Sequence, residues 1–280
     1  MKPYDQIRKL LGRSNACRTI RMMPSISRGF SRAREWNDSI LQGRPNNGTK
    51  ELDSLATANP LKSYFDSITN GNGVWKWEHY FDIYHRHLQK FVGKEVRVVE
   101  VGIYSGGSLG MWKAYFGAKC TIYGVDVQDA CKAYEDAKTK VFIGDQSDRR
   151  FWQDFREQVR NVDVVIDDGG HLPEQQIVTL EETVPYLRAG GVYLCEDTHG
   201  THNQFAAYVH GLTTSLNSTT LRDRGASDGV ACVVDTNNLQ KSIRSVHLYP
   251  FVTVIEKNST PAEQLVSRRR GTQWQPFLKV

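Results

Sequence analysis

The sequence predicts an α/β fold with a doubly wound, mostly parallel sheet of seven strands that ends in an antiparallel hairpin. Short apolar runs alternate with stretches of helical periodicity, which is typical of strands joined by crossover helices. Several runs end in glycine or in acids, as buried parallel strands do where their carboxyl ends carry functional groups. Two further apolar runs are joined around Pro250 and predict the hairpin. No internal repeat is visible, so one domain over residues 75–257 accounts for every periodic stretch.

The predicted domain begins with an amphipathic helix over residues 75–91, whose start is expected to border the functional site. Its core-facing stripe comprises Trp77, Tyr80, Phe81, Tyr84, Leu88 and Phe91. The alternation that follows predicts strands at 96–101, 121–127, 140–143, 162–167 and 191–195, then the hairpin at 242–249 and 251–256. Helices are expected at 107–116, 148–160 and 174–187. Asp148 should cap the second of these helices, Pro173 should open the third, and Ala189–Gly191 should end it.

The flanking segments differ from this domain in charge and composition. We expect a basic N-terminal arm with loops and short helical turns over residues 1–74, and a C-terminal tail over residues 258–280. Residues 1–36 carry nine Lys or Arg and two acids, a balance of +7, which leaves −2 for the rest of the +5 chain. The domain therefore suggests no nucleic-acid groove. Three interpretations of the arm stay open: a solvated arm, which composition favours; an organelle transit peptide; and a surface for an anionic partner or for a second subunit in a homo-oligomer.

Overall composition indicates an ordinary globular protein, with 39% hydrophobic and 24% charged residues. No stretch approaches the roughly 18 to 20 apolar residues of a membrane span. The five cysteines are scattered and form no C-x-x-C pair, which indicates neither a disulfide framework nor a zinc site. A cytoplasmic location is expected, with organelle targeting by the basic N-terminus left open. The Arg268–Gly271 run is either a solvated surface or a segment that folds over the site.

The first strand runs into the segment Val99-Glu-Val-Gly-Ile-Tyr-Ser-Gly-Gly-Ser108. Its glycines Gly102 and Gly106 allow a tight turn and a close approach of backbone to a ligand. They are four residues apart, so no dinucleotide fingerprint G-x-G-x-x-G spans the turn. Glu100 would repel a pyrophosphate at this place, whereas it could accept a hydrogen bond from an amino group. With Ser108, these residues predict a site for an amine-bearing ligand.

The next two strands also end in polar residues. Asp126 lies at the end of the second strand, where an acid accepts hydrogen bonds from both hydroxyls of a ribose. Asp145 follows the third strand and is a candidate to reach an adenine edge. An amine-bearing nucleoside without phosphate fits this set, and S-adenosylmethionine is such a molecule. The alternative is that Glu100 and Asp126 only cap turns.

Paired acids follow both the fourth and the fifth strand. They lie in Ile166-Asp-Asp-Gly-Gly-His171 and in Cys195-Glu-Asp-Thr-His199. Neighbouring strands that end in this way would aim several carboxylates at one point, where like charges repel and raise each other's pKa. A bound hard cation such as Mg²⁺ would resolve that repulsion. Of the first pair, Asp168 is favoured over Asp167 as a metal ligand, because alternation points the two apart and Asp168 has the better spacing to His171.

At these residues the chain resembles class I S-adenosylmethionine-dependent methyltransferases with a Rossmann-like sheet. Over residues 75–257 it resembles in particular the metal-dependent macrolide sugar O-methyltransferases of the mycinamicin and macrocin type. The resemblance implies that Asp168, Glu196 and Asp197 hold Mg²⁺, with Mn²⁺ as a substitute, and that His171 is the general base. It implies a donor site made by Glu100, Gly102, Gly106, Ser108, Asp126, Asp145 and Asp167. Where that family often has Asp-Gly-Ser-His, this chain has Gly170.

The expected function is therefore Mg²⁺-dependent O-methylation of a hydroxyl on a sugar or glycosylated natural product, with a small molecule or glycan as acceptor. A catechol-type O-methyltransferase acting on a small aromatic diol is an alternative, although its base is typically a lysine where this chain has His171. A hydroxylase or a binding protein on the same fold is another. His199 and His202 are expected either to line the acceptor site or to cap the following helix.

Overall fold

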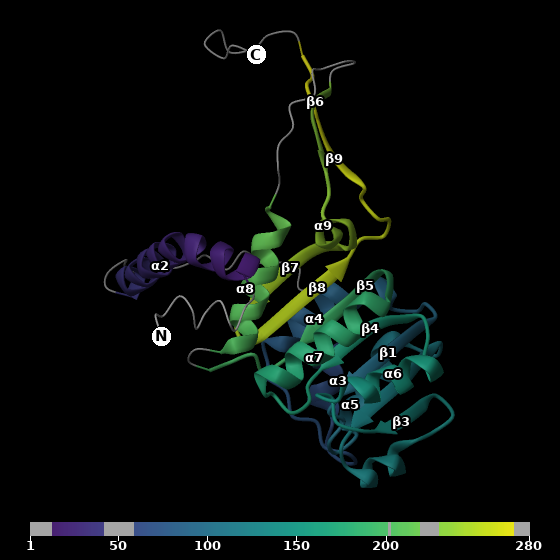
Figure 1. Ribbon diagram of the computed structural model, residues 1–280. Coiled ribbons are helices and arrows are strands. Elements are labelled where there is room, and N and C mark those ends of the chain that lie inside the picture. The colour runs from purple at the N-terminus through teal and green to yellow at the C-terminus, as the bar shows by residue number, and fades with distance from the viewer. Residues whose placement is uncertain (1–12, 42–58, 201–202, 219–229, 272–280) are drawn as a thin grey trace. The chain divides into compact units, whose positions relative to one another are not determined.

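The computed structural model describes residues 13–41, 59–200, 203–218 and 230–271. Its main sheet has seven strands in the order β3-β2-β1-β4-β5-β8-β7 (Figure 1). They are β1 Val96–Val101, β2 Cys120–Asp126, β3 Thr139–Ile143, β4 Val162–Asp167, β5 Leu187–Cys195, β7 Ile243–Tyr249 and β8 Val252–Lys257. The strands β1 to β5 are parallel, and β8 runs antiparallel to both β5 and β7. The predicted doubly wound sheet with a terminal hairpin is confirmed.

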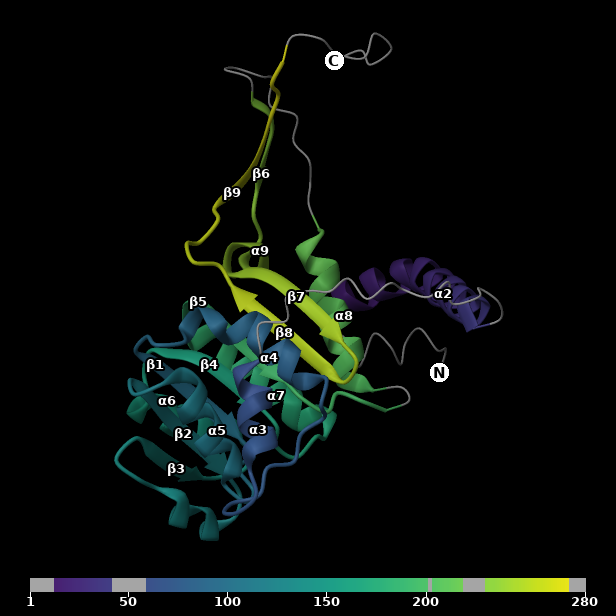
Figure 2. The ribbon, with the colours of Figure 1, turned by 180° about the vertical axis from the view of Figure 1, so that it is seen from behind.

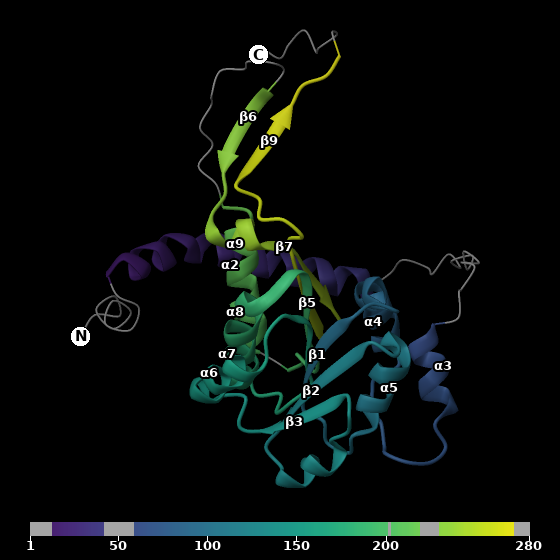
Figure 3. The same cartoon turned by 90° about the vertical axis from the view of Figure 1, so that its right-hand side faces the viewer.

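Helices cover both faces of this sheet (Figure 3). On one face lie α3 Pro60–Ser67, α4 Tyr80–Leu88 and α5 Gly107–Phe116, and on the other lie α6 Arg149–Gln158, α7 Pro173–Thr183 and α8 Gln204–Leu216. Each face has its own apolar core, which includes the fully buried Trp112 on the first face and Trp152 on the second. Burying an apolar side of every strand and helix in this way is the main stabilising contribution to the fold.

The order of strands places four carboxyl ends side by side in the middle of the sheet. The strand β1 lies between β2 and β4, and β5 follows β4, while β3 and the β7–β8 hairpin occupy the two edges (Figure 2). The strand order reverses between β1 and β4, which is where ligands bind in open α/β sheets. The loops after β1, β2, β4 and β5 therefore meet at one place.

Two predicted helix boundaries are wrong. The helix expected over 75–91 begins only at Tyr80, continues as the 3₁₀ turn η1 Gln89–Phe91, and leaves residues 75–79 as a connecting segment. The helix expected over 174–187 ends at Thr183 and passes through the 3₁₀ turn η3 Val184–Tyr186, because Pro185 cannot continue an α-helix. The strand β5 then begins at Leu187, so Ala189–Gly191 lies within a strand and does not end the helix.

Further elements lie outside the pattern that the sequence predicts. A short helix α9 Asn238–Ser242 precedes β7, and β6 Val230–Asp235 pairs with β9 Gln264–Arg268 in a separate antiparallel sheet. The 3₁₀ turn η2 Asp129–Tyr134 follows β2. The first residue of the Arg268–Gly271 run therefore belongs to β9.

The chain divides into two units, Met1–Ala56 and Thr57–Val280, and only the second contains the sheets. Within the first, the helix α2 Arg13–Leu41 forms where the sequence predicts a basic arm. Residues 1–12, 42–58 and 272–280 of the predicted arm and tail lie outside the described residues. None of the helices described, α2 included, combines the length and apolar character needed to cross a bilayer.

Candidate active site

Residues at and just after the carboxyl ends of the central strands line a cavity of about 630 Å³. The predicted site residues that contribute to its wall are Gly102, Ser108, Asp126, Asp168, His171, Glu196 and Asp197. Glu100, Gly106, Asp145 and Asp167 lie near this wall in the chain but are not part of it. The structure thus brings the acids after β4 and β5 into the same cavity as the loop after β1.

Three residues of the cavity wall have a left-handed backbone although they are not glycine. They are Tyr104 with φ 42°, His171 with φ 55° and Asp197 with φ 52°. This conformation costs free energy for a residue with a Cβ, and it persists where surrounding contacts hold it. Such residues cluster at functional sites. The strain therefore marks this cavity independently of its charged groups.

The loop after β1 is held against the end of β4. Gly102 has φ 81°, and a Cβ there would lie only 2.1 Å from the backbone oxygen of Asp168, so no other residue fits. Asp126 Oδ2 accepts hydrogen bonds from the backbone amides of Ile103 and Tyr104, both at 3.1 Å. Asp126 therefore orders the loop while its carboxylate still lines the cavity. Its predicted contact with a ribose stays a prediction.

Glu100 is completely buried beside the cavity. Its Oε1 accepts a hydrogen bond from Trp112 Nε1 at 2.9 Å, whereas Oε2 is buried and accepts none from the described part of the chain. Burial raises the pKa of Glu100 to about 7, and the Lys76 ammonium opposes this shift. A buried carboxylate oxygen without a donor destabilises the fold unless a ligand supplies one.

Asp145 after β3 and Asp167 at the end of β4 have partners within the fold. Asp145 Oδ1 accepts hydrogen bonds from the backbone amide and hydroxyl of Ser147, both at 2.8 Å. Asp167 is buried, and its carboxylate accepts hydrogen bonds from Gln146 Nε2 at 2.9 Å and Tyr193 Oη at 3.1 Å. Gln146 itself lines the cavity, and its Oε1 accepts a hydrogen bond from the Gly170 amide. The predicted donor contacts of Asp145 and Asp167 stay predictions, and Gln146 is a cavity residue that the sequence did not single out.

Asp168, His171 and Asp197 form a group that could hold a metal ion. One ligand atom from each lies within 4.8 Å of the others, and His171 Nε2 is 3.7 Å from Asp197 Oδ2. Glu196, the third predicted metal ligand, lies deeper and is only 1% exposed. The ligand set of Asp168, Glu196 and Asp197 stays a prediction, and the geometry adds His171 as a further candidate ligand.

Lys76 lies between two of these acids, and the sequence analysis did not single it out within the helix expected over residues 75–91. Its Nζ donates to Asp168 Oδ2 at 2.5 Å and to Glu196 Oε2 at 2.8 Å, and its side chain is 3% exposed. Burial alone would lower the pKa of Lys76, but Glu196 and Asp168 outweigh it and raise that pKa. Lys76 therefore carries a positive charge at the centre of the acidic cluster.

Two tyrosines of the predicted core stripe also serve the site. Tyr84 Oη donates to Glu196 Oε1 and Tyr80 Oη donates to Asp197 Oδ1, each at 2.7 Å. Trp77 Nε1, from the segment before α4, donates to Asp197 Oδ1 at 3.1 Å. Hydroxyl groups on an otherwise apolar stripe were the one signal that could have revealed this role. Both carboxylate oxygens of Glu196 accept hydrogen bonds from within the protein, one from Lys76 and one from Tyr84. The segment before α4 and α4 itself therefore fix the orientation of the acids after β5.

Of the two histidines predicted to follow β5, the structure describes only His199. His199 lines the cavity, and its ring packs against Phe251 at 5.4 Å between centroids. Asn203 is the residue that caps α8, through a hydrogen bond from the Ala206 amide to Asn203 Oδ1. The interpretation of His199 as a helix cap is therefore wrong. His202 lies outside the described residues.

Replacing Lys76 with methionine is expected to lower the free energy of unfolding by about 3 to 5 kcal/mol, because it leaves the buried Glu196 and the half-buried Asp168 without a counter-charge. Lys62→Met is the matched control, since it removes a solvent-accessible pair with Asp66 and should change stability little. Denaturant unfolding of both variants without added metal measures the difference. Equal effects would show that Lys76 does not compensate the acidic cluster.

Comparison with known proteins places this fold. The MycE methyltransferase of the mycinamycin biosynthetic pathway, solved in complex with Mg, SAH and mycinamycin VI, superimposes with a TM-score of 0.56. The two are 24% identical, and the match covers 71% of this chain and 53% of MycE. The likeness identifies the fold as a Rossmann-like methyltransferase fold.

Similar proteins of assigned function are sugar O-methyltransferases. An 8-demethyl-8-alpha-L-rhamnosyl tetracenomycin-C 2'-O-methyltransferase of Streptomyces olivaceus is 25% identical over 73% of this chain and 57% of its own length. Demethylmacrocin O-methyltransferase of Streptomyces fradiae is 35% identical over 51% of this chain and 38% of its own. L-Olivosyl-oleandolide 3-O-methyltransferase of Streptomyces antibioticus is 35% identical over 62% and 44%, respectively.

The resemblance to macrolide sugar O-methyltransferases is thereby confirmed. No family model matches the chain. The matches span between 38% and 57% of the length of the three relatives named above.

Proposed function

We propose that this chain is an S-adenosylmethionine- and Mg²⁺-dependent O-methyltransferase that acts on a hydroxyl of a sugar or glycosylated natural product. The observation that carries the proposal is the cluster of Asp168, His171 and Asp197 in the wall of a cavity that also contains the glycine loop after β1. Acids that bind a cation and a histidine that accepts a proton are the groups that methylation of a sugar hydroxyl requires.

The donor half of the cavity suits S-adenosylmethionine. Beside the cavity wall, Glu100 has a buried oxygen without a hydrogen-bond donor, which the amino group of the methionine moiety would supply. Asp126 presents a carboxylate at the place where a ribose binds in this fold. Glu100, just before the glycine turn, would repel the negative charge of a pyrophosphate there. These features support a nucleoside donor with a positive charge and no phosphate.

The acceptor half suits a hard divalent cation. Asp168 and Asp197 supply oxygen ligands, which Mg²⁺ and Mn²⁺ prefer. Glu196 stands behind them and is oriented by Tyr84 and Lys76. When bound, the cation would polarise the acceptor hydroxyl and lower its pKa.

Methyl transfer forms a bond between the acceptor oxygen and the methyl carbon and breaks the bond from that carbon to the sulfonium sulfur. The acceptor hydroxyl must lose its proton as this happens. His171 lies in the cavity wall with its Nε2 facing Asp197, so it can take the proton while the carboxylate stabilises the charged ring. The Tyr80 and Trp77 hydrogen bonds hold Asp197 in place for this task. The second product is S-adenosylhomocysteine.

Native mass spectrometry of the purified chain, followed by a methyl-transfer screen over glycosides and catechols, tests the proposed function. Bound S-adenosylmethionine and cation-dependent transfer to glycosides are expected. Transfer to catechols alone would favour the catechol-type alternative. A bound donor without transfer to either class, or turnover that needs iron and oxygen, would favour a binding protein or a hydroxylase.

Asp126→Ala is expected to weaken S-adenosylmethionine binding by about tenfold or more, the effect of losing one or two charge-assisted hydrogen bonds. Asp129→Ala, which removes an exposed acid three residues away, is the control for local charge. Calorimetric titration measures both dissociation constants. Unchanged binding by a folded Asp126→Ala protein would contradict the ribose assignment.

A further inference from the structure

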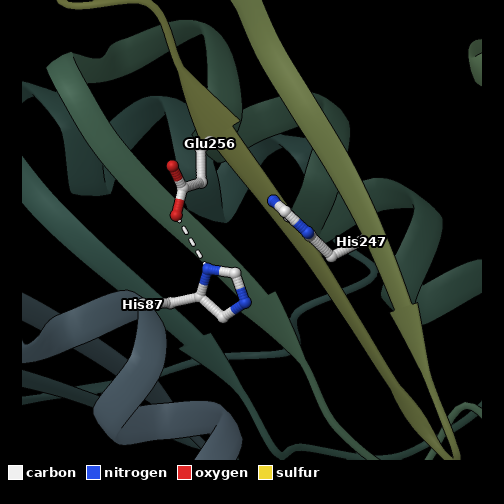
Figure 4. A group of neighbouring side chains, drawn as sticks. All are labelled: His87, His247 and Glu256. Atoms are coloured by element: carbon white, nitrogen blue, oxygen red, sulfur yellow. Dashed lines mark hydrogen bonds and ion pairs between the residues drawn. The ribbon is translucent and has the colours of Figure 1, made fainter.

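A second cluster of metal-ligating side chains lies away from the cavity, between α4 and the terminal hairpin. It consists of His87 from α4, His247 from β7 and Glu256 from β8 (Figure 4). One ligand atom from each lies within 4.8 Å of the others. Ser245 is paired with Glu256 across the hairpin, so His247, two residues further along, has its side chain on the same face of the sheet as Glu256. The hairpin and the helix thus present three ligands to one point.

Hydrogen bonds already orient these side chains. His87 Nδ1 lies 2.7 Å from Glu256 Oε1, and its other nitrogen, Nε2, lies 2.9 Å from Tyr249 Oη. His247 Nε2 lies 3.0 Å from Ser245 Oγ. A ligating histidine normally donates its second ring N–H to a neighbouring oxygen, which fixes the tautomer that leaves the first nitrogen free for the metal. Tyr249 gives His87 that partner.

We propose that His87, His247 and Glu256 bind a divalent cation of the zinc class and that this ion fastens α4 to the β7–β8 hairpin. Two imidazole nitrogens and one carboxylate are a frequent protein ligand set for Zn²⁺. Nitrogen ligands disfavour Mg²⁺, so this site and the oxygen-rich cluster at Asp168 and Asp197 differ in the metal they select. The scattered cysteines indicated no zinc site, and this one uses no cysteine.

The surroundings favour the metal-binding forms of His87 and Glu256. Burial lowers the pKa of His87, although Glu256 opposes this shift, so the ring favours its neutral form. Burial alone would raise the pKa of Glu256, but His87 and Lys90 outweigh it and lower that pKa. Lys90 Nζ lies 3.8 Å from Glu256 Oε2 and is 39% exposed, so it can turn to solvent when a cation arrives. Arg86 is a further cationic group that acts on His87, and Arg244 acts on Lys90 beside the cluster.

The proposed ion would bind the same face of α4 whose tyrosines donate hydrogen bonds to Asp197 and Glu196. Tyr80, Tyr84 and His87 are spaced by four and three residues, so they lie on one side of α4. Tyr80 and Tyr84 bond Asp197 and Glu196, while His87 bonds Glu256 of the hairpin. A metal at His87 would therefore fix the end of α4 opposite to the one that orients the acids. Its role is structural and does not depend on the proposed methyl transfer.

Zinc binding by the full chain tests this proposal. Native mass spectrometry with Zn²⁺ should find one ion retained in a His171→Gln variant, whose first cluster lacks its nitrogen ligand. In that background, zinc at about a hundred times its Kd should raise the melting temperature by about 5 °C or more, while Mg²⁺ at the same concentration should not. Cobalt(II) at the same site would report nitrogen and oxygen ligation through its visible absorption.

Two variants assign the ion to the cluster, and a third controls for histidine content. In the His171→Gln background, His247→Gln and His87→Gln should each abolish zinc retention and the zinc-dependent rise in melting temperature. His247 lies on the edge strand, so its replacement is the one expected to leave the fold intact. His85→Gln removes a histidine from the same helix outside the cluster and should retain both effects. Zinc retention unchanged by His247→Gln, or no zinc bound in the His171→Gln background, would overturn the proposal.

Discussion

Replacing His171 with alanine is expected to lower kcat by about a hundred-fold or more, because the acceptor hydroxyl loses the group that takes its proton. The binding of S-adenosylmethionine should be unchanged, since none of the donor-site acids contacts this ring. Steady-state kinetics, with calorimetry for the donor, measures both effects. His210→Ala, which alters an exposed histidine of α8 outside the cavity, is the control.

The same variant separates two roles that the geometry allows for His171. The ring belongs to the group of Asp168, His171 and Asp197 that could share one cation, so it is a candidate ligand as well as a candidate base. If His171 is only a base, its removal leaves the affinity for the cation unchanged. If His171 is a ligand, its removal weakens that affinity. Normal turnover with donor and cation bound as before would remove His171 from the mechanism. If excess Mg²⁺ restores the rate of the variant, His171 acts as a ligand of the metal ion.

Exhaustive chelation is expected to lower turnover by about a hundred-fold or more, since a Lewis acid contributes several kcal/mol to stabilising the transition state. Added Mg²⁺ should restore the rate, and Mn²⁺ should substitute for it. Asp168→Asn and Asp197→Asn should each raise the Mg²⁺ concentration needed for half-maximal rate. Full turnover after chelation would reject the metal-dependent mechanism.

Asp154→Asn is the matched control for those substitutions, because it neutralises an exposed acid on α6 that is not part of the cavity wall. It should leave the Mg²⁺ dependence unchanged. Glu196→Gln asks a further question, since both Glu196 oxygens are held by Tyr84 and Lys76. A loss of Mg²⁺ affinity in this variant as large as in Asp168→Asn would establish Glu196 as a direct ligand, as the resemblance implies.

The features that follow from local pattern were predictable from the sequence. The strand at Val162–Asp167 has the expected bounds, because its apolar residues and terminal acids are contiguous. The cap at Asp148 was also predictable, since its side chain accepts from the Arg150 amide within the same turn. The acids after β4 and β5 share a cavity because adjacent parallel strands end at the same edge of a sheet.

Features that depend on distant pairings were not predictable in this way. Lys76 lies 92 residues from Asp168 and 120 from Glu196, and nothing in its neighbourhood distinguishes it from a solvated lysine. Gln146 lines the cavity whereas Asp167 is buried behind it, and this difference also depends on the packing of α7. Gln146 Nε2 donates to Thr179 of α7 as well as to Asp167. The cluster at His87 joins residues about 160 positions apart. Sequence spacing carries no information on such contacts.

The left-handed backbone at His171 and Asp197 has a consequence for how this chain would respond to selection. Glycine adopts that conformation without strain, so His171→Gly would relieve it, whereas Asp197→Gly would also remove the acceptor of the Tyr80 hydroxyl and the Trp77 indole. His171→Gly would delete the side chain that serves as base in the proposed chemistry. Directed evolution of heat-tolerant variants without a screen for activity would therefore lose His171 more readily than Asp197, and relief of backbone strain opposes function at His171.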